Sequence, residues 1–186
     1  MPILGIIDSQ KSGHLYNNSY TSLQTVTVGA GGASSITFSS IPSTYTHLQV
    51  RLFGRTTSSN AYATVYIQNN SDTGTNYTYH ALSGSGSSAS SSGRGTGSDT
   101  AMTVQNLTGA GATANNFGAT IIDILDYANT NKYKTMRELG GYDNNGSGYI
   151  NLNSSVWLNT NAISSLTITA DGNFVQYTSA ALYGVN

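Results

Sequence analysis

The stretch HLQVRLF at residues 47–53 alternates polar and apolar side chains from His47 to Leu52. In an extended chain, Leu48, Val50 and Leu52 would share one face, and the polar side chains between them would share the other. A period of two residues is typical of a half-buried β-strand, so we expect a strand here with its aliphatic face in a core.

The same alternation recurs along the rest of the chain. Clusters of Gly, Asn and Ser separate the strand candidates, which follow one another at intervals of roughly 8–15 residues, as short strands do in sandwiches and barrels. This rhythm predicts an all-β chain folded as a jelly-roll-like antiparallel β-sandwich. The other strand candidates are residues 34–38, 61–67, 76–82, 100–107, 117–126, 132–139, 148–158, 163–170 and 174–185.

Two segments need separate interpretation. Residues 117–139 contain Ile121, Ile122 and Leu125, which could line one side of a helix. The β-branched residues and the turn-prone ANTN sequence within this segment favour a strand–turn–strand hairpin instead. Residues 84–98, with the sequence GSGSSASSSGRGTGS, are predicted to be a long surface loop because Ser and Gly dominate them.

The composition limits the classes of function. The length of 186 residues suggests one domain, and the apolar fraction of 38% is enough for a core. Charged residues make up 8% of the chain, against roughly 25% in an ordinary globular domain, and the net charge is −1. Without a basic stripe or an apolar run of about 18 residues, we expect neither nucleic acid nor a membrane as partner. The absence of cysteine excludes disulfides and thiolate chemistry.

The first 19 residues differ from the rest of the chain. The sequence PILGII is a compact apolar patch, and a polar, turn-prone stretch comes after it. The patch could be the first strand of the core, or it could be an arm that docks on another subunit. We divide the chain into a short N-terminal docking arm at 1–19 and a β-sandwich domain at 20–186. The side chains expected to fill pockets on the partner are Ile3, Leu4, Ile6 and Ile7.

The side chains that usually carry catalysis or metal binding are scattered along the chain. Asp123 and Asp126 form the closest pair of carboxylates, yet on a strand they point to opposite faces and are poor joint acid–base partners. We therefore predict no enzymatic activity, no metal and no cofactor. The three histidines, which form no ligand motif, are His14, His47 and His80.

The segment DNNGSG at residues 143–148 has two interpretations. Asp143, Asn145 and Ser147 supply oxygens at positions 1, 3 and 5 of a calcium loop. Ser154, however, stands where such a loop needs a bidentate Glu. An Asn-Gly turn that joins two strands explains the same residues with fewer assumptions, and it is our expectation.

The tyrosines, 13 in number, are frequent enough to suggest a binding surface. Tyr and Trp combine apolar area with a polar tip, which suits both subunit interfaces and stacking on sugars. Most of the tyrosines are expected to be ordinary sheet residues, since Tyr favours strands. The candidates for a glycan or interface contact are Tyr62, Tyr66, Tyr79, Tyr142 and Trp157.

Four sequence blocks resemble small virion and tail-associated structural proteins of tailed bacteriophages. They are the opening MPILGIIDSQKSGHL, the segments SSITFSSIPSTYTHLQVR and DILDYANTNKYKTMRELGGYDNNGSG, and the closing ALYGVN. The resemblance covers most of the chain except the Ser- and Gly-rich stretch near 84–98. Proteins of this family are described as virion components without a catalytic role.

The resemblance implies a non-enzymatic virion protein that is assembled in the host cytoplasm. It implies a homo-oligomer, a trimer in our expectation, which the N-terminal arm anchors to other virion proteins. A tail-fibre or tail-tip position is preferred to head decoration. The alternative is a carbohydrate-binding module that recognises a host surface glycan through Tyr-lined loops, including the region 84–98.

Overall fold

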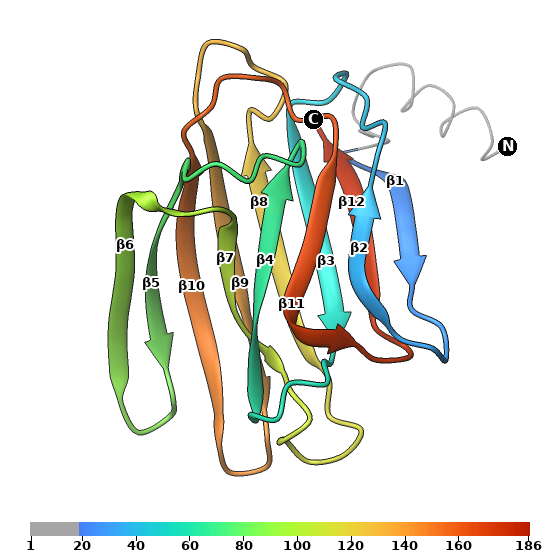
Figure 1. Ribbon diagram of the computed structural model, residues 1–186, viewed down its shortest axis with the longest axis vertical. Coiled ribbons are helices and arrows are strands. Elements are labelled where there is room, and N and C mark those ends of the chain that lie inside the picture. The colour runs from blue at the N-terminus through green and yellow to red at the C-terminus, as the bar shows by residue number, and fades with distance from the viewer. Residues whose placement is uncertain (1–18) are drawn as a thin grey trace, which may run out of the picture.

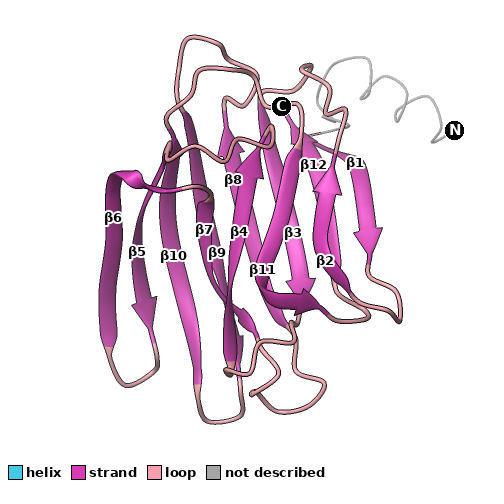
Figure 2. Ribbon diagram, in the orientation of Figure 1, coloured by secondary structure: helices cyan, strands magenta, loops and turns pink. Residues whose placement is uncertain are grey.

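The computed structural model describes residues 19–186, apart from the side chains at positions 96, 97, 105 and 106. The described chain forms two antiparallel sheets packed face to face (Figure 1, Figure 2), with no helix long and apolar enough to cross a membrane. The predicted all-β sandwich is confirmed. Its strands are β1 (Tyr20–Thr27), β2 (Ala33–Phe38), β3 (His47–Gly54), β4 (Tyr62–Asn69), β5 (Tyr77–Gly84), β6 (Ala89–Asp99), β7 (Met102–Thr108), β8 (Gly118–Leu125), β9 (Lys134–Asp143), β10 (Gly148–Trp157), β11 (Leu166–Phe174) and β12 (Ser179–Val185).

The strand order is that of a jelly roll with two added hairpins. Eight strands form the two halves β1-β12-β3-β8 and β2-β11-β4-β7. Along the chain, successive strands of this set alternate between the halves except at β4 and β7, which is jelly-roll connectivity. The β9–β10 and β5–β6 hairpins extend the first half beyond β8 into an eight-stranded sheet. Figure 1 shows β6 at one side of the molecule and β1 at the other.

The hydrophobic core lies between the two sheets. Leu48, Val50 and Leu52 of β3 are at most 1% exposed, as the alternation in residues 47–53 predicts. Burial of a whole aliphatic side chain stabilises a fold by about 1.5–3 kcal/mol, so this layer supplies much of the driving force for folding. Other buried members of the same cluster are Ile36, Phe38, Val65, Ile67, Ile122, Ile124, Leu166, Ile168 and Phe174.

The sequence analysis did not predict two of the strands, β6 and β1. Residues 84–98, expected to be a surface loop, contribute most of β6, which pairs with β5, so the loop prediction is wrong. At a sheet edge, main-chain hydrogen bonds to one neighbour hold a strand whose Ser and Gly side chains pack little. In β1, a register shift between Ser22 and Gln24 interrupts the alternation that marks the other strands.

The two expected hairpins are confirmed. Residues 117–139 contain β8, a turn and the first part of β9, with no helix. The β9–β10 connection is the predicted Asn-Gly turn, in which φ is 53° at Asn145 and 99° at Gly146. Two consecutive left-handed residues define a type I′ turn. The amide of Asn144 donates to the carbonyl of Ser147 at 2.6 Å and closes the turn.

Two cationic side chains hold the loops between strands. The guanidinium of Arg55 donates four hydrogen bonds of 2.8–3.1 Å to main-chain carbonyls in the loop 110–116. The ammonium of Lys134, at 0% exposure, donates three hydrogen bonds of 2.6–3.0 Å to carbonyls in the loops that precede β9 and follow β10. Both groups supply donors that these loop carbonyls would otherwise need from water.

Candidate functional site

The larger sheet reverses its polarity in the added hairpins. On β10 three polar residues, Asn151, Asn153 and Ser155, are buried at 0–2% exposure, together with Trp157 at the end of the strand. The apolar Ile150 and Leu152, at alternate positions, face away from the smaller sheet and are 61% and 55% exposed. An isolated domain would not benefit from this arrangement, because amides are buried while apolar area stays in water. The reversal therefore marks the outer face of these strands as a candidate site.

Exposed aliphatic side chains form one row across four strands, which we call the apolar row. Ile121 of β8 lies opposite Leu139 of β9, and Leu139 lies opposite Leu152 of β10. Leu152 in turn lies opposite Leu82 of β5. These four side chains are 44–55% exposed. Directly opposite side chains on neighbouring strands are about 5 Å apart, so the row is continuous from the jelly roll into both added hairpins.

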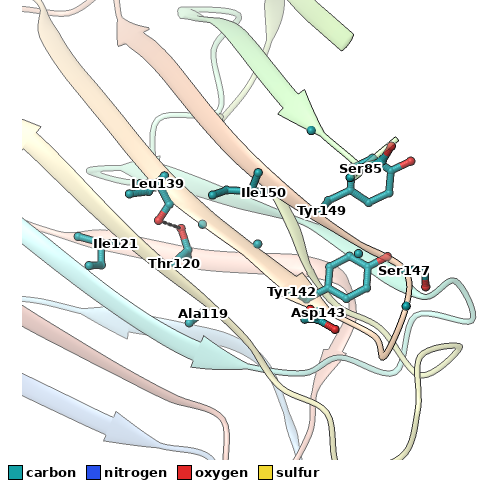
Figure 3. Close-up of a pocket in the computed structure, with 16 residues that line it drawn as sticks. Ser85, Ala119, Thr120, Ile121, Leu139, Tyr142, Asp143, Ser147, Tyr149 and Ile150 are labelled. Carbon is teal, nitrogen blue, oxygen red and sulfur yellow. Dashed lines mark hydrogen bonds between the residues drawn. The ribbon is translucent and has the colours of Figure 1, made fainter. Parts of the chain in front are cut away.

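Glycines leave a depression beside the apolar row. Gly141 of β9 lies opposite Ile150 of β10, and Ile150 lies opposite Gly84 of β5. Gly141 has a φ of 153°, and a Cβ there would collide with the carbonyl oxygen of Tyr149, so only glycine fits. The depression measures about 690 Å³, and Figure 3 shows aliphatic side chains from three strands around it. The outer face thus combines a ridge with a hollow.

A charged line runs along the other side of the apolar row. Asp123 of β8 lies opposite Arg137 of β9. The line continues through Ser154 of β10 to His80 of β5. The side-chain amide of Gln49 donates to Asp123 at 2.8 Å and positions this carboxylate. A second depression, of about 750 Å³, lies along His80, Arg137 and part of the apolar row. The outer face therefore carries charges of both signs beside its aliphatic strip.

Hydrogen bonds compensate the polar groups buried on the inner side of the hairpins. Asn153 Nδ2 donates to the carbonyl oxygen of Thr103 on β7 at 2.6 Å, and its Oδ1 accepts from Ser155 Oγ at 3.4 Å. Ser83 Oγ donates to Asn151 Oδ1 at 2.6 Å. Such bonds remove most of the cost of burying an amide. The edge strand β7 thus accepts a hydrogen bond from a buried amide of β10, on the side of the sheet opposite the exposed aliphatic side chains.

The aromatic residues selected from the sequence do not converge on one site. Tyr62 and Tyr142 both lie near Tyr149, with ring centroids 6.1 and 6.3 Å from its ring. Burial raises the pKa of the Tyr142 phenol above its usual value, and the neighbouring phenols raise it further. Tyr66 lies on β4 of the smaller sheet, and Tyr79 lies on β5 of the larger one.

Trp157 is a core residue. It is 1% exposed, its ring stacks on Tyr77 with 6.3 Å between centroids, and its Nε1 donates to Asp72 Oδ2 at 2.8 Å. Burial acts to raise the pKa of Asp72, but hydrogen bonds from Asn76, Trp157 and the Gly74 amide outweigh it and hold this pKa below its ordinary value. Asp72 is therefore a charged acceptor that orients the single tryptophan.

The carboxylates weighed as catalytic residues have separate structural partners. Asp123 accepts from Gln49 on the outer face. Asp126 follows β8 with a φ of 49°, and the hydrogen bond from Lys132, 2.6 Å long, lowers the pKa of its carboxyl. The main-chain amide of Asp126 donates to Nδ1 of His47 at 3.0 Å. Within residues 19–186, as far as they are described, no three His, Asp or Glu side chains gather as a metal site requires.

Residues 1–18 of the expected docking arm, including His14, lie outside the described residues. The role of the arm therefore stays a prediction. The side chains concerned are Ile3, Leu4, Ile6 and Ile7.

Sequence reasoning missed the apolar row, although part of its signal is present. The sequence YINLNSSVW at 149–157 alternates correctly for a strand. Alternation identifies two faces without saying which one is buried, and the aliphatic face is the usual choice. On β10 that choice fails, because the neighbouring edge strand β7 offers main-chain acceptors to Asn153.

Comparisons with known proteins do not assign the chain to a family. No family model matches it, and no curated protein matches it significantly. The galectin LEC-6 of Caenorhabditis elegans shares 6% identity at a TM-score of 0.27, over 92% of this chain and 99% of the galectin. A β-fructofuranosidase of Schwanniomyces occidentalis, solved with fructosyl-erythritol, shares 9% identity at a TM-score of 0.25, over 91% of this chain and 35% of that one. Similarity this low carries no argument about function.

Proposed function

We propose that this chain is a non-enzymatic structural protein of a tailed-phage particle and works packed against other protein chains. The observation that carries the proposal is the reversed polarity of the added hairpins, in which Leu139 and Leu152 face outward while Asn153 is buried. Contiguous apolar strips of this kind mark interaction surfaces. The four sequence blocks that resemble virion proteins indicate the kind of assembly.

In this proposal, residues 1–19 anchor the chain to another virion protein. The apolar PILGII sequence would add a strand to a sheet edge of that partner and fill its pockets. The carbonyl of Ser19 accepts from the amide of Asn186 at 3.3 Å, beside the edge strand β1. The arm would therefore leave the sandwich at the sheet edge opposite the added hairpins. The arm and the apolar row could then each contact another chain at the same time.

Deletion of residues 2–10 tests the proposal in assembled particles. The truncated chain is expected to keep the buried-tryptophan fluorescence of Trp157 and to be missing from purified particles. The matched control replaces Ser9 and Gln10 by Ala within the same segment, and it is expected to be incorporated. Normal incorporation of the truncated chain would contradict the anchoring arm. Absence of the unaltered chain from particles would contradict the virion role.

A carbohydrate-binding function is the second candidate, and the depression beside Gly141 favours it. Ser85, Asp143 and Ser147 border this depression, so polar groups surround an aliphatic floor, a combination found in small-molecule sites. A glycan array probed with the full chain tests this candidate. Binding that Ile150→Glu abolishes would support it, whereas no binding at millimolar protein would count against it.

A further inference from the structure

We propose that the partner on the outer face of β8, β9, β10 and β5 is a second copy of this chain. The apolar row would then be a subunit interface, and the added hairpins would be the part of the fold that builds it. The inference rests on the proposed structural role, which places many copies in one particle, and it names the occupant of the candidate site.

The face is large enough for a stable protein contact. With strands about 4.8 Å apart and about 3.4 Å per residue, seven residues on each of the four strands of the apolar row cover about 450 Å². With the flanking strands β3 and β6, six strands of the same length cover about 700 Å², near the figure of about 800 Å² per partner for a standard stable interface. A small ligand would occupy only one of the two depressions. The dimensions therefore fit another protein.

The charges on this face fit a second copy better than a partner of one sign. The charged line has Asp123 at one end and His80 at the other, with Arg137 between them. A two-fold axis that runs along the strands between β9 and β10 places β8 of one copy against β5 of the other. Asp123 of each copy then faces His80 of its neighbour, which can donate a hydrogen bond to it. The line is thus complementary to itself.

The same axis matches ridges with hollows. In the apolar row it places Leu139 of one copy against Leu152 of the other, because β9 then faces β10. In the neighbouring line it places Ile150 of one copy against Gly141 of the other, where the depression of about 690 Å³ lies. A projecting side chain opposite a glycine lets two sheet faces approach closely. This geometry yields a two-fold dimer, where the sequence resemblance implies a trimer.

Light scattering on the full chain measures its molar mass in solution, which distinguishes a monomer, a dimer and a trimer. At about 100 µM, well above the Kd of a standard interface, we expect twice the 19.4 kDa of one chain. The double variant Leu139→Glu, Leu152→Glu should weaken association at least about 100-fold. The matched control is Tyr133→Glu, in the β8–β9 loop, whose side chain is equally exposed at 55% and which should leave association unchanged.

A charge exchange tests the orientation of the two copies. His80→Asp should weaken association because two carboxylates then face each other, and adding Asp123→His to the same chain should restore it. A monomer or a trimer for the unaltered chain at about 100 µM would overturn the inference whatever the variants do. Unchanged association of the double glutamate variant, folded as judged by Trp157 emission, would overturn it as well.

The outcomes separate this inference from the proposed function. A dimer that depends on Leu139 and Leu152, in a chain absent from phage particles, would uphold the interface and remove the virion role. A chain that enters particles but stays monomeric in solution at about 100 µM would uphold the virion role and remove the interface.

Discussion

Truncation of two neighbouring residues of β10 should lower the free energy of unfolding by unequal amounts. We expect the polar residue to cost more than the aliphatic one, the opposite of what their polarity suggests. Leu152→Ala removes a side chain that is 55% exposed, whereas Asn153→Ala removes one that is 2% exposed. In an ordinary half-buried strand the aliphatic residue is the core position and the amide faces water. The pair therefore tests the reversed polarity within one strand and one sheet.

The expected magnitudes follow from the contacts of each side chain. Truncation of a fully buried Leu costs about 2–5 kcal/mol, and less than half of Leu152 is buried, so about 1 kcal/mol is expected. Asn153→Ala leaves the buried carbonyl of Thr103 without its 2.6 Å donor, which costs about 1–3 kcal/mol. It also removes the acceptor of Ser155 Oγ, for about 1 kcal/mol more. The sum for Asn153→Ala is about 3 kcal/mol.

Urea unfolding followed by the fluorescence of Trp157 measures both losses. Unfolding is measured at several protein concentrations and the values are extrapolated to low concentration, so that association does not contribute to the stability that is compared. Asn153→Ala should lower the free energy of unfolding about threefold more than Leu152→Ala, at an unchanged m-value. Leu82→Ala, in the same apolar row at 54% exposure, is the control and should resemble Leu152→Ala. A larger loss for Leu152→Ala than for Asn153→Ala would refute the reasoning.

Three further predictions concern the loops and the acid response of the fold. Arg55→Lys should cost about 2 kcal/mol in urea unfolding, because an ammonium does not span the carbonyls that the guanidinium binds; an unchanged midpoint would contradict this. Lys134→Met should cost about 3 kcal/mol by leaving three loop carbonyls without a donor, and a more stable variant would be the contrary result. The folded pKa of Asp72 lies below the ordinary 3.8, so its carboxylate stabilises the fold at neutral pH and loses that effect as the pH falls below 3.8. Asp72→Asn should therefore flatten the decline of stability in this acid range, and an unaltered decline would count against it.

The positions of most strands follow from the sequence because each strand has one buried face. Residues 47–53 are the clearest case, since Leu48, Val50 and Leu52 occupy every second position and all enter the core. The strand β6 does not follow from the sequence, because Ser and Gly carry no apolar period. Its position at the sheet edge, where main-chain pairing with β5 suffices, depends on the tertiary fold.

The candidate site was harder to predict from the sequence than the fold was. Its aliphatic residues come from strands far apart in the chain, and only the register between those strands places Leu82 beside Leu152. The tyrosines attract attention in the sequence because of their number, yet Trp157 is buried and the other candidates are spread over β4, β5 and β9. A surface that depends on register between hairpins carries no local signal in any one segment.

The chain has no cysteine, so a single introduced thiol reports on one position. The labelling rate of such a thiol tests most directly the proposal that a second copy covers the outer face. We expect the maleimide labelling rate of Leu152→Cys to fall as the protein concentration rises through the dissociation constant. Tyr133→Cys, at a position that is also 55% exposed, should label at a constant rate. A labelling rate at Leu152→Cys that does not change with concentration, in a folded chain, would contradict the claim that a second copy covers the added hairpins.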